Sequence, residues 1–285
     1  FARIGVSHDS LTTEWPEDFA YHTSDAYQFF LDLGPVKNAD KNHFKKDIAF
    51  WTEITEHPNY DAFWQARNIL PHLKNIKSAV MTVGGWYDAE DLYGTFKTYH
   101  AAEKQNPGIK NTLVIGPWSH GGWRREDSSS LGDAFFGYST TDYYSNEIIL
   151  PYFKYYLKDE GEPAFPEALM FETGANRWRS FDVWPPANTT PSALYFHEKG
   201  VLAFAPQKEN GDAHDSYISD PAKPVPYSYD PEAFWPRDYM TEDQRFAARR
   251  PDVLTYKTDV LEEDITLAGP LTANLFVATT GTDAD

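Results

Sequence analysis

Two short apolar segments, each followed by a glycine turn and an ionisable side chain, constrain this sequence more than any other feature. The first covers residues 80–91 (VMTVGGWYDAED), and the second covers residues 113–120 (LVIGPWSH). Each begins with apolar, mostly β-branched residues and breaks at glycine, which is typical of a buried parallel strand. Asp88 and His120 therefore come just past the carboxyl ends of two strands, at the edge where open α/β sheets hold ligands and catalytic groups.

The segment between these strands is predicted to be a helix, because Leu92, Phe96 and Tyr99 recur at i, i+4 and i+7. The unit therefore runs strand, acid, helix, strand, histidine. In an α/β-hydrolase the acid and the histidine follow the nucleophile in this order. A buried carboxylate holds the imidazole in the tautomer that can deprotonate a serine, and it stabilises the imidazolium that forms. We therefore expect Asp88 and His120 to be the acid and base of a triad.

Each of these two residues also has a simpler interpretation. An aspartate after a glycine–aromatic turn is often only a helix cap, and a histidine between Trp118 and Trp123 is often only packed. Their occurrence together, 120 − 88 = 32 residues apart on successive strands, favours the catalytic interpretation. It predicts that the two side chains lie within hydrogen-bond reach, at ~2.6–3.2 Å.

The segments GGWYDAED (84–91) and IGPWSHG (115–121) resemble the X-prolyl dipeptidyl-peptidase/cocaine-esterase superfamily of serine hydrolases. Within it, the sequence is most similar to the α-amino-acid ester hydrolases and glutaryl-7-aminocephalosporanic acid acylases. Residues 57–64 (HPNYDAFW) resemble the segment before the acid strand, and residues 244–246 (QRF) and 266–271 (TLAGPL) resemble the C-terminal β-domain. The resemblance implies acyl transfer from amino-acid esters or β-lactam-type acyl amides, without a cofactor.

The resemblance also implies a role for Glu90 and Asp91. A matching pair in the α-amino-acid ester hydrolases helps to bind the α-ammonium group of the substrate, and the cocaine-esterase branch lacks it. The alternative is structural, because acids in the first turn of a helix are stabilised by its dipole. Trp86 and Tyr87 are candidates to line the acyl pocket, with core packing as their alternative. We expect no metal site, because the remaining histidines are scattered without the spacing of metal ligands.

The sequence contains no G-x-S-x-G motif, and Ser119 is adjacent to His120, where it cannot reach the imidazole in line. In the family that the sequence resembles, the nucleophile and its oxyanion donors precede the region matched here. We therefore expect this chain to be an internal segment of a longer protein and to be inactive alone.

The expected fold is the C-terminal part of an α/β-hydrolase sheet with a helical cap, followed by an all-β sandwich, both incomplete. Period-two segments separated by proline- and glycine-rich turns predict the sandwich, at residues 168–173, 193–196, 253–256 and 271–277. The resemblance supplies a jelly-roll topology for it. The expected divisions are a loop (1–24), a helical cap (25–72), the hydrolase part (73–158) and the β-sandwich (159–285).

Composition limits the partners. The chain has 25 basic and 43 acidic residues and a formal net charge of −18, which disfavours nucleic acid and an anionic membrane. The absence of cysteine excludes disulfides and cysteine nucleophiles within the chain. We expect a small-molecule ester or amide substrate, and a homo-oligomer stays open. The resemblance favours a periplasmic or secreted location.

Two other functions stay open at this point. An X-Pro dipeptidyl-peptidase or a carboxylesterase would use the same acid and base on other substrates. A protein of a different class, a non-catalytic β-sandwich binding protein, would retain the hydrolase part without its chemistry. The presence of a G-x-S-x-G serine in the same protein distinguishes the enzymes from the binding protein.

Overall fold

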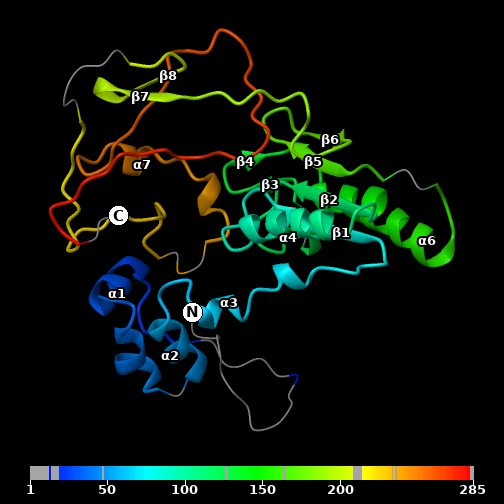
Figure 1. Ribbon diagram of the computed structural model, residues 1–285. Coiled ribbons are helices and arrows are strands. Elements are labelled where there is room, and N and C mark those ends of the chain that lie inside the picture. Colours follow the sequence, from blue (N-terminus) through cyan, green and yellow to red (C-terminus); the bar gives the residue numbers. More distant parts are fainter. Residues whose placement is uncertain are drawn as a thin grey trace. The chain divides into compact units, whose positions relative to one another are not determined.

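The computed structural model describes residues 13, 19–46, 48–125, 128–162, 165–207, 214–232, 234 and 236–282 (Figure 1). The chain divides into two compact units, residues 1–72 with 230–236 and residues 73–229 with 237–285. Within the described ranges, no helix combines the length and the apolar character needed to cross a membrane.

The first unit is helical. It contains α1 (Ala26–Leu33), α2 (Ala49–Glu56) and α3 (Ala62–Gln65), with a π-helical turn at Asp40–Phe44 and a 3-10 turn at Leu70–His72. Asp25 begins α1 by accepting a hydrogen bond from the Gln28 N–H, a common N-cap arrangement. The unit has its own apolar core, formed by Leu33, Ala39, Phe44, Ile48 and Trp51. The sequence predicts helices in this region, and its role as a cap stays a prediction.

The second unit is built on a four-stranded sheet in the order β1-β2-β5-β6. Strands β1 (Val80–Gly85), β2 (Asn111–Gly116) and β5 (Ala168–Glu172) are parallel, and β6 (Arg177–Phe181) is antiparallel to β5. Every residue of the central strand β2 is buried. Strand β2 lies between β1 and β5 and is covered on both faces, which explains its continuous apolar sequence.

Helices lie on both faces of this sheet (Figure 1). On one face, α4 (Leu92–Gln105) places Tyr99 against Leu113 and Ile115 of β2. On the other face, Val114 packs with Trp118 and with the π-helical turn Tyr144–Ile149, which lies between α5 (Thr140–Tyr143) and α6 (Leu150–Lys158). Alternate residues of β2 therefore enter two separate cores, as the pleat of a strand requires.

The sheet crosses the domain division expected at residue 159. Strand β5 pairs in parallel with β2, and β6 follows β5, so these two strands extend the α/β sheet. The reason lies in the burial of β5, where Ala168, Met170 and Phe171 are all buried on the two faces. Between β2 and α5 the chain forms a 3-10 turn (Gly122–Arg124) and a short hairpin of β3 (Ser130–Leu131) and β4 (Ala134–Phe135).

The rest of the second unit has little regular structure. Strands β7 (Tyr195–His197) and β8 (Val201–Ala203) form a two-stranded antiparallel sheet, and a single bridge joins Val201 to Lys257. A 3-10 turn (Tyr239–Thr241) and α7 (Arg245–Ala248) precede that bridge. The strands expected at 253–256 and 271–277 are not formed, and the described residues contain no jelly roll. A strand needs a hydrogen-bonded neighbour as well as a suitable sequence.

Candidate active site

The turn that follows β1 is bonded directly to the turn that follows β2. We name these the acid turn (residues 86–91) and the histidine turn (residues 117–122). The Trp86 N–H donates to the Gly116 carbonyl at 2.9 Å, and the Tyr87 N–H donates to the Trp118 carbonyl at 3.0 Å. A Cβ at Gly85 would lie 2.1 Å from the Trp118 carbonyl oxygen. Only glycine permits this approach, so the glycine that ends β1 allows the two turns to meet.

The histidine turn is also held from within the core. The Trp118 side chain is buried, and its indole N–H donates to the Thr140 hydroxyl at 2.9 Å. That hydroxyl in turn donates to the Ser128 carbonyl at 2.9 Å. Gly121 has a φ of 68°, a left-handed conformation that lets the chain turn sharply after His120. Sequence reasoning missed Ser128 and Thr140, because nothing in their local sequence connects them with Trp118.

Asp88 is buried and its position is fixed by the backbone of its own turn. Its Oδ1 atom accepts the N–H groups of Glu90 and Asp91, both at 2.9 Å. These two bonds fix the orientation of the carboxylate. The capping role and the catalytic role that the sequence left as alternatives for Asp88 are therefore compatible in one side chain.

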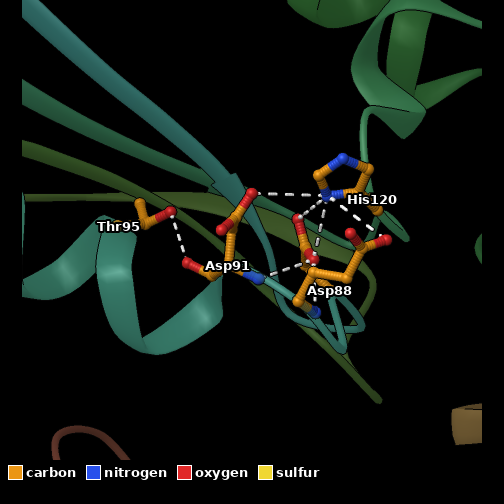
Figure 2. A network of polar contacts seen from close by, with 5 residues as sticks. Asp88, Asp91, Thr95 and His120 are labelled. Atoms are coloured by element: carbon orange, nitrogen blue, oxygen red, sulfur yellow. Dashed lines mark hydrogen bonds and ion pairs between the residues drawn. The ribbon is translucent and has the colours of Figure 1, made fainter. Parts of the chain in front are cut away.

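The Asp88 carboxylate faces the imidazole of His120. The His120 Nδ1 atom lies 3.2 Å from Oδ2 and 3.3 Å from Oδ1 of Asp88 (Figure 2). Because a carboxylate can only accept, Nδ1 is the protonated nitrogen and donates to it. Nε2 is then the basic nitrogen, and Figure 2 shows it on the side of the ring away from the carboxylates. The His120 side chain is 44% exposed, which leaves Nε2 accessible.

Glu90 and Asp91 bring two more carboxylates to the same nitrogen. Asp91 Oδ2 lies 3.5 Å and Glu90 Oε1 3.9 Å from His120 Nδ1. The Asp91 side chain is 66% exposed and the Glu90 side chain 48%, whereas that of Asp88 is 1% exposed. The sequence placed this pair near the acid but gave no sign that both side chains face the imidazole.

The two aromatic residues of the acid turn have different environments. The Trp86 ring packs against the core around Tyr99, and its indole N–H donates to the Phe171 carbonyl at 2.8 Å. These are the contacts of a core residue. The Tyr87 ring stacks on Phe136 with the ring centroids 6.4 Å apart, and burial raises the pKa of the Tyr87 phenol. A substrate-binding role for either residue stays a prediction.

A metal ion is a second use to which this group of side chains could be put. Ligand atoms from Asp88, Asp91 and His120 all lie within 4.8 Å of one another. Asp88 Oδ1, however, already accepts two backbone N–H groups, and the two carboxylates face a nitrogen that donates to Asp88. These contacts satisfy the group without an ion, and we assign no metal to it.

Two family models match the chain. The X-Pro dipeptidyl-peptidase (S15 family) model covers residues 9–122, and the model of the X-Pro dipeptidyl-peptidase C-terminal non-catalytic domain covers residues 150–285. The chain belongs to the X-prolyl dipeptidyl-peptidase/cocaine-esterase superfamily. The first match contains both turns of the site. The second begins before β5, so in this superfamily member the C-terminal match includes two strands of the α/β sheet.

Relatives of known name agree with this assignment. The chain is 27% identical to the cocaine esterase of Rhodococcus sp. (strain MB1 Bresler) over 244 residues, which are 82% of this chain and 41% of the esterase. An aminopeptidase from a marine sediment archaeon (Thaumarchaeota archaeon) superposes with a TM-score of 0.79 at 34% identity, over 88% of this chain and 42% of that one. An α-amino acid ester hydrolase gives 0.79 at 32% identity, over 86% and 42%. The chain therefore spans about two fifths of the length of these relatives.

Proposed function

We propose that Asp88 and His120 are the acid and the base of a serine hydrolase whose nucleophilic serine lies in sequence upstream of this chain. The observation that carries the proposal is the contact of a buried, backbone-fixed carboxylate with Nδ1, which leaves Nε2 free. His120 Nε2 takes the proton of the serine hydroxyl as its oxygen attacks the substrate carbonyl. The same proton then goes to the leaving group, and a water or an amine releases the acyl group from the serine.

Asp88 contributes by fixing the tautomer and by stabilising the imidazolium. In the enzyme that contains this chain, Asp88→Asn should lower kcat by about 10⁴-fold, because the amide favours the wrong tautomer. His120→Ala should cause a loss of similar size. Activity within tenfold of the native enzyme in both variants would contradict the proposal. Asp159→Asn is a matched control, because it removes an exposed carboxylate at a left-handed position that asparagine tolerates.

The serine itself is tested with a fluorophosphonate probe, which labels activated serines covalently. We expect the longer protein to be labelled at one serine and this 285-residue chain alone to be unlabelled. Stoichiometric labelling of the chain alone would show that the nucleophile lies within it. A longer protein that hydrolyses no ester and takes up no label would instead favour the binding-protein alternative.

We further propose that the substrate is an α-amino-acid ester or a β-lactam-type acyl amide with a free α-ammonium group. The structural similarity to an α-amino acid ester hydrolase supports this substrate class, and so do the exposed carboxylates of Glu90 and Asp91 beside His120. An exposed pair of opposite charges contributes only ~0.2–1 kcal/mol. The ammonium contact should therefore tune specificity without dominating binding.

An X-Pro dipeptidyl-peptidase is the second candidate, and the two family models favour it. Its substrate also carries a free ammonium, but one residue further from the bond that is cleaved. Comparing an amino-acid p-nitrophenyl ester, its des-amino analogue and an X-Pro p-nitroanilide separates the candidates. Turnover of the first only is expected for an ester hydrolase, turnover of the anilide for the peptidase, and equal turnover of both esters for a plain carboxylesterase.

Glu90 provides the residue-level test of ammonium binding. Glu90→Gln should lower kcat/KM about threefold to fivefold on the amino-acid ester, which corresponds to ~0.6–1 kcal/mol. The loss on the des-amino ester should be smaller, because that substrate offers no charge to the carboxylate. Equal losses on the two esters would remove Glu90 from the substrate site.

A further inference from the structure

We propose that Asp91 is a second acid partner of His120, a positioning residue that acts through the imidazole. The inference rests on the proposed function and divides the acidic pair that the sequence treats as one unit. Glu90 keeps the role of attracting the ammonium group, whereas Asp91 supports the protonated imidazole together with Asp88.

Asp91 is the residue at which helix α4 begins. Asp91 occupies the N-cap position of α4, but its side chain accepts no capping hydrogen bond. At the same position of α1, α3 and α5, the side chains of Asp25, Asp61 and Ser139 each accept a backbone N–H. An aspartate normally occupies this position because of that bond. The Asp91 carboxylate is therefore not used by the helix.

The Asp91 carboxylate points toward His120. Its Oδ2 atom lies 3.5 Å from His120 Nδ1, and Figure 2 shows the group turned toward the imidazole. The backbone of Asp91 is held on both sides. Its N–H donates to Asp88 Oδ1, and its carbonyl accepts from the N–H and the hydroxyl of Thr95, all at 2.9 Å. These hydrogen bonds fix the backbone position from which the Asp91 side chain extends toward the imidazole.

Three carboxylates lie close to Nδ1 of His120. Nδ1 faces Asp88 at 3.2 Å, Asp91 at 3.5 Å and Glu90 at 3.9 Å, so the imidazolium of the transition state would form beside three carboxylates. A cation, Arg125, follows the histidine turn, and its guanidinium would lie 3.5 Å from a Cβ placed at Gly121. Of the two exposed carboxylates, Asp91 is the nearer to Nδ1. The negative charge of Asp91 therefore stabilises His120 specifically when the imidazole is protonated, as it is in the transition state.

The variants can separate this role from a structural one. Asp91→Asn removes the charge but retains a residue that begins helices equally well, and Asp91→Glu restores the charge on a longer side chain. In the enzyme that contains this chain, Asp91→Asn should lower kcat on a des-amino ester threefold to tenfold with KM unchanged. Asp91→Glu should recover part of that loss, and Asp159→Asn should cause none.

A second measurement needs no nucleophile and uses this chain as it is. Nitrogen-15 NMR of the His120 ring, assigned with His120→Gln, gives the ratio of the Nδ1–H to the Nε2–H tautomer. In the Asp88→Asn background, adding Asp91→Asn should lower this ratio threefold to tenfold, because a neutral amide replaces the remaining charged acceptor closest to Nδ1–H. An unchanged ratio would overturn the inference. If the Asp88→Asn chain does not fold, the kinetic result for Asp91→Asn alone decides.

The kinetic outcomes also distinguish the two proposals. A loss confined to substrates with a free amino group would place Asp91 in the ammonium site and overturn the inference, while the proposed function would stand. A longer protein without any esterase activity would overturn the proposed function. The tautomer ratio would then still show whether Asp91 is a partner of His120.

Discussion

Strand β2 and residues 271–277 have similar apolar sequences but contrasting environments. Leu113, Val114 and Ile115 of β2 are each 0% exposed, whereas Phe276 is 107% and Val277 85% exposed. The difference is not one of composition, because both segments favour the extended conformation. Strand β2 has β1 and β5 as hydrogen-bonded neighbours, and helices cover both of its faces. The second segment has no pairing partner among the described residues.

This comparison explains why the site lies where it does. A triad requires two side chains from different turns to be positioned relative to one another with an accuracy better than about 1 Å. The acid and histidine turns achieve this because the strands that carry them are paired in register, Gly85 with Gly116. A segment without a hydrogen-bonded neighbouring strand has no such register to position its side chains.

The largest effect is expected at Gly85. Gly85→Ala would place a methyl group 2.1 Å from the Trp118 carbonyl oxygen, so the two turns must separate. Overpacking of this kind costs roughly 3 kcal/mol, and we expect that loss in urea unfolding, together with loss of the Asp88–His120 contact. NMR of the His120 ring reports that contact.

Gly94→Ala is the matched control for this substitution. Gly94 lies in α4, and a Cβ there would meet nothing within 4 Å. Alanine should stabilise the helix by about 0.5–1 kcal/mol, because glycine loses more freedom on folding. A destabilisation of similar size in both variants would mean that the contact with Trp118 does not cause the effect at Gly85.

A smaller loss of stability is expected at Thr140, whose hydroxyl accepts the indole N–H of Trp118 in the histidine turn. Thr140→Val preserves the shape of the side chain but removes the acceptor of the Trp118 indole N–H. A buried donor left unpaired costs ~1–3 kcal/mol. Thr189→Val removes the hydrogen bond of an exposed hydroxyl to the Pro186 carbonyl and should change stability by less than about 0.5 kcal/mol. Equal effects in chemical unfolding would show that the indole bond is not important.

The sequence predicted the part of the fold in which local pattern and tertiary partners agree. Strands β1 and β2, helix α4 and the approach of Asp88 to His120 all follow from segments within 41 residues of one another. The pairing of β5 with β2 was missed, because period-two patterns do not say which sheet a strand joins. The contact of Asp91 with the imidazole was missed for a different reason. A spacing places a residue in a turn, but the direction of its side chain depends on which hydrogen bonds the turn leaves open.

A partly buried carboxyl group of α4, Glu103, predicts a pH effect on stability. Burial, and to a lesser extent the nearby Glu167 carboxylate, raises the pKa of Glu103, although the Asn111 amide donates to it at 2.8 Å. A raised pKa in the folded state gives stability below the unfolded pKa, and that stability is lost as pH rises through the folded value. Glu103→Gln should therefore be more stable than the native chain at neutral pH, and this advantage should disappear in acid.

Glu172 should give stability the opposite dependence on pH. A hydrogen bond from Arg177, and a second one from Arg179, lower the pKa of Glu172. A lowered pKa gives stability above the unfolded pKa, which is lost as pH falls through the folded value. Glu172→Gln should lose stability at neutral pH and match the native chain in acid. Thermal unfolding of both variants from pH 3 to 8 checks the two signs, and parallel curves would contradict both.

The smallest effect is expected at Phe276, in the segment without a pairing partner. Its side chain is fully exposed, so Phe276→Ser removes no buried surface. Unfolding free energy should change by no more than about 0.5 kcal/mol, the usual range for surface positions. Leu113→Ala, in the packed strand, should cost roughly 2–5 kcal/mol by the same measurement, because it leaves a cavity in a closed core. A cost above about 1 kcal/mol for Phe276→Ser would show that this ring packs in solution, and the contrast between the two segments would then fail at that residue.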